Sequence, residues 1–383
     1  MSIGSGLFLP SITPLFGAIC NKDSISQETS FTLYYLAKNV GALLSPIISG
    51  YIANIYGYHF AFIFNGLAMF SGVVVFYLGK AHLKHIVGFY INKRKSKHKI
   101  KNLFSKNIIL LLLCLFVPLI SIVIKNQFDG ILLAVASIFV ACYLTYVLFR
   151  RDKTTRRNFA IMFFAFAIMF IYLICLGQGG TTLNLFIDRI TDRLVFHHLI
   201  PTSVYYALDP IFMLTIGPLV LVFVVKISHF LQSKLSFQKL TAALFILGVA
   251  YGIFFFAAKS ATISGHSSSA YIVLAYILFP ITELLLFPTI LSLLYDRSPK
   301  DLIGVTMGVF MLAQALSAYG MGMLSKYGRI TFKINSLAQL KNASGIYQHF
   351  FATICFSLIA SSIIAFVFLL ISKRQSIKLT PGC

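Results

Sequence analysis

Residues 270–295 read AYIVLAYILFPITELLLFPTILSLLY, an apolar stretch in which Glu283 is the only charged side chain. About 20 apolar residues suffice for a helix to cross a bilayer, so this stretch predicts a membrane-spanning helix. Similar stretches occur at about 1–19, 31–54, 58–79, 104–124, 130–149, 158–178, 207–227, 239–258, 302–325 and 349–372. Lipid cannot satisfy open strand edges, so the sequence predicts an all-α integral membrane protein with about eleven transmembrane helices.

The composition of the chain agrees with this fold class. Hydrophobic residues make up 58% of the 383 positions, charged residues make up 11%, and mean hydropathy is +0.87. A soluble domain carries about 25% charged residues. No Walker-type G-x-x-x-x-G-K-[ST] and no Ser/His/Asp set occurs, so we expect neither an ATP-driven pump nor an enzyme. The cysteines and histidines show no metal-ligand spacing, and we expect no metal and no bound cofactor.

The net charge of +22 follows the predicted topology. Together with Lys106, six loops hold 23 of the 32 Lys and Arg residues: 20–30, 80–103, 150–157, 226–239, 296–301 and 373–383. The loops between them hold 8, an alternation that the positive-inside rule predicts, and it places the C-terminus in the cytoplasm. We interpret the dense cluster at 93–101 as a topology anchor at the lipid surface. No aromatic RNA-binding motif accompanies it, so we expect no nucleic-acid partner.

Ionisable residues within the spans are costly and usually functional, and two stand out. Glu283 lies between Pro280 and Pro288, and prolines release backbone carbonyls inside a helix. A buried carboxyl group there can bind substrate or exchange protons, or it can pair with a nearby base. Lys38 lies one helical turn after Tyr34 or Tyr35, and it either faces a site or extends to the cytoplasmic interface.

Further acidic residues lie at the predicted outer ends of spans. Asp209 precedes Pro210 at the predicted start of a span, where a helix N-terminus would favour its carboxylate. Asp188, Arg189, Asp192 and Arg193 follow another span. They form either a surface ion-pair turn or a gate at the outer mouth.

Several motifs together resemble one family, the proton-dependent oligopeptide transporters of the major facilitator superfamily. TTLNLFIDRITDR at 181–193 resembles the family's S-L-N-L-F-A-D-R-x-x-D-R, and LDPIF at 208–212 resembles its L-N-P-x-F. TELLLFP at 282–288 resembles G-E-L-x-x-S-P, and the segments at 4–13, 33–41 and 306–320 match further motifs in family order.

The resemblance implies two helical bundles around a central cavity that work by alternating access. Residues 1–79 would form a partial N-terminal bundle of family helices four to six, and 80–157 a basic linker with a two-helix insertion of bacterial members. Residues 158–383 would form the C-terminal six-helix bundle and a short tail. We therefore expect a major-facilitator-type bundle that lacks the first three helices.

The resemblance also assigns site residues. Tyr34 and Asn39 would line the peptide site, Gln178 would lie near it, and Glu283 would meet the peptide amino group. Lys38 remains as a cation for the peptide carboxylate, while Asp209 takes the place of the family's Asn and adds a carboxylate. Asp188, with Arg189 beside it, would belong to the outer gate, and Glu283 would also handle protons. The family's E-x-x-E-R-F string is absent, and Leu9 replaces the Lys of its G-L-F-K-P motif.

The functional expectation is a proton-coupled symporter of di- and tripeptides in a bacterial inner membrane, incomplete as this chain. Protons would be its coupling ion. One alternative is a non-transporting remnant, or a partner of another chain that supplies three helices. Another is a major-facilitator transporter of a different small substrate.

Overall fold

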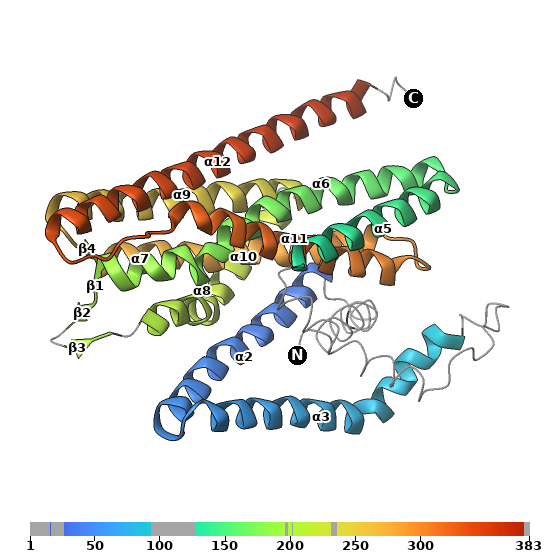
Figure 1. The fold of residues 1–383 in the computed structure, drawn as a ribbon. Coiled ribbons are helices and arrows are strands. Elements are labelled where there is room, and N and C mark those ends of the chain that lie inside the picture. The colour runs from blue at the N-terminus through green and yellow to red at the C-terminus, as the bar shows by residue number, and fades with distance from the viewer. Residues whose placement is uncertain are drawn as a thin grey trace.

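The computed structural model describes Phe16 and residues 27–92, 128–195, 198–200, 202–230 and 236–378. Within these ranges the chain is a set of long helices with a few two-residue strands (Figure 1). The predicted spans at 104–124 and, apart from Phe16, at 1–19 lie outside the described residues. Each of the nine other predicted spans falls on a long helix.

The N-terminal part forms a helical hairpin. Helix α2 (Gln27–Tyr56) turns at Gly57 into α3 (Tyr58–Asn92), and in Figure 1 the two diverge from the other helices. Gly57 has a φ of +91°, a left-handed conformation that glycine adopts without steric cost. After residues 93–127, which lie outside the described ranges, α5 (Asp129–Phe149) packs against α11 (Ile303–Ser325).

The rest of the chain forms one helical bundle. Its elements are α6 (Lys153–Leu176), η1 (Gly177–Gly180), α7 (Thr182–Ile190), α8 (Thr202–Phe230), α9 (Ser236–Ser264), α10 (Ser269–Arg297), α11 (Ile303–Ser325), η2 (Lys326–Gly328) and α12 (Leu337–Lys378). Helix α9 packs most extensively on α12 and α10, and α10 also contacts α2, α6 and α8. The position of α10 therefore makes it the helix on which a central site can form.

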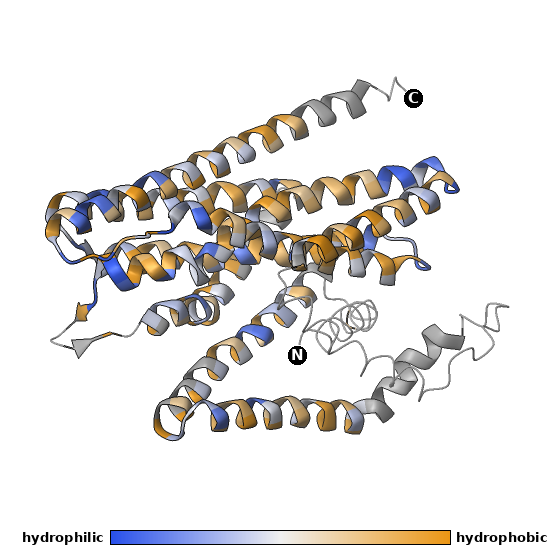
Figure 2. Ribbon diagram, viewed as in Figure 1, coloured by the Kyte–Doolittle hydropathy of each residue, from blue (hydrophilic) through white to orange (hydrophobic). Residues whose placement is uncertain are grey.

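Seven helical segments of the described chain are long and apolar enough to cross a membrane. They lie at Tyr58–Gly79, Gly130–Phe149, Lys153–Ile190, Phe237–Ser264, Ser269–Arg297, Ile303–Gly328 and Leu337–Phe368. Figure 2 shows apolar residues along these helices and hydrophilic ones gathered near the helix ends, as a spanning bundle requires. Of the most apolar part of each segment, 61% is buried in α10 but only 6% in α3 and in α5, so α3 and α5 present apolar side chains outward.

Four two-residue strands lie at one end of the bundle, which we call the β end. Strand β1 (Thr191–Asp192) pairs in parallel with β4 (Ser267–Ser268), and β2 (Leu194–Val195) pairs antiparallel with β3 (His198–Leu199). Gly265, with a φ of +94°, ends α9 just before β4. Its amide donates to Ala261 O at 2.9 Å. Arg151 and Asp301 form an ion pair at the opposite end of the bundle.

Candidate functional site at the α2–α8–α10 contact

The buried stripe of α2 carries its contact with α10. Phe31, Tyr35 and Asn39 recur at four-residue intervals and are 0%, 7% and 9% exposed. A spacing of four keeps side chains on one face of a helix. The Tyr35 ring stacks on Phe287 of α10, with the ring centroids 4.9 Å apart.

Glu283 lies in the middle of α10 at this contact and is 5% exposed. The hydroxyl of Tyr35 donates a hydrogen bond to Glu283 Oε2, across 248 positions of sequence. On the neighbouring Thr282, the hydroxyl bonds that of Tyr172 from α6 at 2.6 Å. Both Pro280 and Pro288 are accommodated inside a continuous helix. The predicted site residue Glu283 is therefore buried among polar partners from two other helices.

Lys38 lies at the rim of this contact. Its side chain is exposed, with Nζ 5.4 Å from the centroid of the Tyr35 ring, and its charge acts on Glu283. The amide of Asn39 donates to the backbone oxygen of Tyr35 at 2.9 Å. Tyr34, one position from the buried stripe, packs against Phe16 at 5.1 Å between ring centroids. From α2 it is Tyr35, a residue not predicted for the site, whose hydroxyl bonds Glu283 directly.

Asp209, which belongs to α8, also lies near Glu283. Its Oδ1 is buried without a hydrogen-bond partner among the described residues, and the charge of Glu283 acts on its carboxyl group. The interpretation of Asp209 as a residue at a helix N-terminus is wrong, because α8 begins at Thr202. Asp209 thus lies about two turns inside the helix. Pro210 is likewise internal to α8.

Gln178 is buried in η1 and all its hydrogen-bonding groups are used within the protein. Its Nε2 donates to the backbone oxygens of Ile174 and Met321, at 3.2 and 3.1 Å. Its Oε1 accepts from the hydroxyls of Thr181 and Thr182, at 3.1 and 2.9 Å. The side chain therefore joins the α6–η1–α7 segment to α11.

At the β end, the predicted gate residues form an ion-paired turn. Arg193 Nη2 lies 3.1 Å from Asp188 Oδ1, and Asp188 also accepts from the Thr202 hydroxyl at 3.4 Å. Arg189 lies in the last turn of α7, and Phe186 of the same helix packs edge-on against Tyr347 of α12, with the ring centroids 5.3 Å apart. These contacts tie α7 to the start of α8 and to α12.

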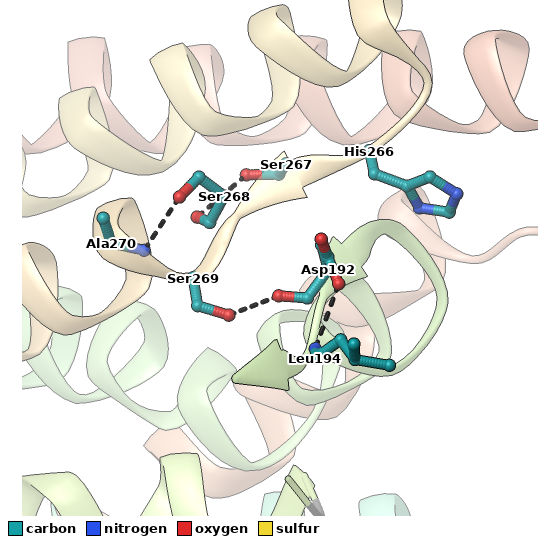
Figure 3. A pocket seen from close by; sticks show the side chains of 7 residues that line it. All are labelled: Asp192, Leu194, His266, Ser267, Ser268, Ser269 and Ala270. Carbon is teal, nitrogen blue, oxygen red and sulfur yellow. Dashed lines mark hydrogen bonds between the residues drawn. The ribbon is translucent and has the colours of Figure 1, made fainter. Parts of the chain in front are cut away.

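A cavity of about 440 Å³ lies beside this turn, between Asp192 and residues 266–270. Figure 3 shows the side chains that line it. The Ser269 hydroxyl donates to the backbone oxygen of Asp192, and Tyr205 bonds the same hydroxyl at 2.6 Å. Asp192 Oδ1 accepts from the Leu194 amide at 3.0 Å. A second cavity of about 720 Å³ opens between Arg189 and Lys333. Both cavities belong to the β end and lie apart from Glu283 along α10.

Known proteins share both sequence and fold with this chain. Dipeptide and tripeptide permease B of Salmonella typhimurium is 24% identical over 324 residues, which are 82% of this chain and 63% of the permease. The peptide transporter YePEPT of Yersinia enterocolitica is 21% identical over 341 residues, 84% of this chain and 66% of that protein. The chain thus spans less than two thirds of the length of these relatives.

Solved structures give the same result for the fold. A bacterial homologue of the human peptide transporters PepT1 and PepT2 aligns with a TM-score of 0.63 at 20% identity, over 90% of this chain and 71% of the other. The peptide transporter POT in complex with sulfate aligns with a TM-score of 0.65 at 20% identity, over 90% and 68%. The model of the POT family matches residues 1–338 of the 383, and the chain therefore belongs to the POT family.

Proposed function

We propose that the chain forms the peptide-recognising part of a proton-coupled transporter of di- and tripeptides that works by alternating access. Family membership supports this, as do the names of the relatives, which are di- and tripeptide permeases. In the proposal the protein lies in a bacterial inner membrane with its C-terminus in the cytoplasm. Its partners are peptides and lipid, and its coupling ion is the proton.

The observation that carries the proposal is the position of Glu283. A free peptide carries an ammonium group at one end and a carboxylate at the other. Glu283 offers a buried carboxyl group on α10, and Lys38 offers a cation at the rim on α2. Charge-assisted hydrogen bonds to both ends would select a zwitterion of limited length.

The proposal gives each predicted residue a part. Glu283 and Asp209 meet the peptide amino group, Lys38 meets the carboxylate, and Tyr34 and Asn39 line the site on α2. Gln178 positions the η1 segment beside it through the bonds described above. At the β end, Asp188 and Arg189 belong to the gate, and Glu283 also handles the proton.

The test uses the purified full chain in lipid. Equilibrium binding of radiolabelled dialanine is measured in nanodiscs, and uptake is measured in proteoliposomes with an inward proton gradient. We expect saturable binding that N-acetyl-dialanine, which lacks the ammonium group, does not compete away. Accumulation above equilibrium that a protonophore abolishes would establish coupling, and binding without accumulation would contradict proton-coupled transport by this chain. A chain that neither binds nor accumulates dialanine contradicts the proposed function.

A further inference from the structure

The larger cavity at the β end is lined by basic side chains. It measures about 720 Å³, within the range of about 300–1,000 Å³ that small-molecule sites occupy. Among the described residues that line it, the ionisable ones are Arg189, His266 and Lys333. Asp188, the acidic neighbour of Arg189 in sequence, is paired with Arg193 at 3.1 Å. A cavity with this lining attracts anions.

Three segments of the chain meet at the cavity. Arg189 lies in the last turn of α7, His266 follows the end of α9, and Lys333 precedes α12. Figure 1 shows the ends of α7 and α9 together with the start of α12 at the β end. A Cβ on Gly265 would approach the Leu337 side chain to 2.7 Å, so the end of α9 lies directly against the first turn of α12. Helix packing therefore sets where the three basic residues begin.

Hydrogen bonds fix the backbone on two sides of the cavity. The Ser336 hydroxyl accepts from the Gln339 amide at 3.3 Å, and Gln339 Oε1 accepts from the Asn335 amide at 2.8 Å. These reciprocal bonds cap the start of α12. On the other side, the Ser264 hydroxyl donates to the backbone oxygen of His266 at 2.8 Å. Both walls thus have a defined backbone.

The cavity also has apolar walls, and it lies at the boundary of the membrane. Phe332 and Leu340 are among the apolar residues that line it. The spanning segments Lys153–Ile190 and Phe237–Ser264 end here, and Leu337–Phe368 begins here. A ligand can therefore place an anionic group beside the basic residues and an apolar part toward the hydrocarbon of the bilayer.

The two permanent cations of the cavity are not explained by topology or by pairing. In the proposed orientation the β end lies outside the cytoplasm, because α12 runs from it to a cytoplasmic C-terminus. The positive-inside rule disfavours Lys and Arg in short loops on that side. Within the described part of the chain, neither Arg189 nor Lys333 forms an ion pair. Both are therefore available to an anionic ligand.

We propose that this cavity binds the phosphodiester headgroup of an anionic phospholipid, with the glycerol backbone and the first part of the acyl chains against the apolar side chains. The planar guanidinium of Arg189 suits bidentate donation to phosphate oxygens, and Lys333 adds a second charge. His266 offers a further ring N–H. Basic pockets between membrane helices bind phospholipid headgroups in other proteins. The inference goes beyond the proposed function, since lipid binding is measured without peptide.

The test measures lipid binding to the purified full chain in detergent by native mass spectrometry. Phosphatidylglycerol is compared with zwitterionic phosphatidylcholine that has the same acyl chains. We expect the wild type to bind phosphatidylglycerol more tightly than phosphatidylcholine. The double variant Arg189→Gln with Lys333→Gln should lose roughly 25-fold in affinity for phosphatidylglycerol, about fivefold for each cation. Equal binding of the two lipids to the wild type overturns the proposal.

A matched double variant separates the cavity from general surface charge. Lys326→Gln with Arg329→Gln removes two exposed cations that precede the same cavity wall and do not line the cavity. This variant should bind phosphatidylglycerol like the wild type, and an equal loss in both double variants overturns the proposal.

Inorganic phosphate tests the other source of the same anionic group. We expect millimolar phosphate to displace little phosphatidylglycerol, because it leaves the apolar walls unused. If inorganic phosphate binds the wild type as tightly as phosphatidylglycerol does, and binds Arg189→Gln with Lys333→Gln less tightly, the cavity takes free phosphate and the lipid proposal is wrong.

Discussion

At the residue scale, Glu283 obtains its hydrogen-bond donor from a distant helix. Tyr35 is the donor, and Thr282 beside Glu283 is bonded to Tyr172. A side chain held in this way keeps one orientation, so in the proposed function a ligand ammonium group would meet a carboxyl group that needs little reorganisation.

Replacing Glu283 by Gln keeps the shape of the side chain and removes its charge. A charge-assisted hydrogen bond contributes about 1.5–3 kcal/mol. Dialanine affinity should therefore fall roughly 10- to 100-fold, measured as Kd in nanodiscs. N-acetyl-dialanine, which lacks the ammonium group, should bind weakly to the wild type and lose little more in the variant. Equal losses for both ligands would show that Glu283 does not receive the amine.

Gln178→Leu removes a side chain that makes four hydrogen bonds and leaves buried partners unpaired. Each unsatisfied buried group costs about 1–3 kcal/mol, so the free energy of unfolding in detergent should fall by at least that amount. Gln238→Leu, a change of an exposed glutamine on α9, should stay within about 0.5 kcal/mol of the wild type. Similar values for the two variants would contradict the structural part assigned to Gln178.

Glu283 and Lys38 could be predicted as site residues from the sequence because charges are rare in apolar spans. Tyr34 was assigned to the site through the family resemblance, whereas the helical spacing left open whether Tyr34 or Tyr35 lies beside Lys38. The four-residue spacing of Phe31, Tyr35 and Asn39 is the signal that separates them. The proximity of Asp209 to Glu283 could not be predicted from the sequence, because it depends on how α8 and α10 pack.

At the element scale, the helix ends follow local chemistry. Asp152 caps α6 by accepting from the amides of Thr154 and Thr155, at 3.1 and 3.2 Å. Hydropathy locates the apolar part of a helix and not its start. Helix α8 begins at Thr202, before the predicted span at 207–227, and α12 begins at Leu337, before the predicted span at 349–372. Both starts carry polar residues, which lower hydropathy without opposing helix formation.

The Gly57 turn gives a clean test of backbone conformation. A Cβ added at Gly57 meets no atom within 4 Å, so Gly57→Ala adds only the strain of a positive φ. That strain is about 1–2 kcal/mol, and the variant should unfold at lower temperature. Gly66→Ala, in open space on α3, should be neutral or stabilising by up to about 1 kcal/mol. Equal unfolding temperatures would argue against the left-handed turn.

The Asp152 cap predicts a pH dependence. The Thr155 hydroxyl and the backbone amides donate to the carboxylate and hold the pKa of Asp152 below its ordinary value of 3.8. The contribution of the Asp152 cap to the stability of the fold is therefore complete above pH 3.8. It is lost as the pH falls through the lower pKa that Asp152 has in the folded state. Asp152→Ala should lower Tm at pH 7, and the difference from wild type should shrink in acid below about pH 3.8. Asp152→Asn, which cannot titrate, should unfold like the wild type at pH 7, and its Tm should change less in acid than that of the wild type.

At the scale of the whole molecule, contacts of two kinds connect the helices. The β1–β4 pair lies within the bundle of α6–α12, whereas the Tyr35–Glu283 bond joins that bundle to α2. In alternating access the bundles move relative to one another. The Tyr35–Glu283 contact should therefore respond to ligand, whereas the β1–β4 pair should not.

Engineered disulfides can distinguish contacts within the bundle of α6–α12 from contacts between that bundle and α2. Asp192 and Ser268 are register partners, and neighbouring strands bring Cα atoms to about 5 Å, within disulfide reach. In a background without native cysteines, Asp192→Cys with Ser268→Cys should oxidise to the same yield with and without dialanine. Leu36→Cys with Leu284→Cys spans α2 and α10, and its yield should change when dialanine binds. An unchanged yield there would argue against relative motion of the bundles.

The long separation between Tyr35 and Glu283 also bears on biogenesis. A ribosome delivers helices in order, so α2 and α8 are made before α10. When the segment with Glu283 leaves the translocon, the Tyr35 hydroxyl and the Asp209 carboxyl group are already in the membrane to receive it. Glu283 is thus the last of the three residues to be inserted. Helix α10 can then pack directly against polar groups of α2 and α8, so the Glu283 carboxyl group need not be exposed to lipid.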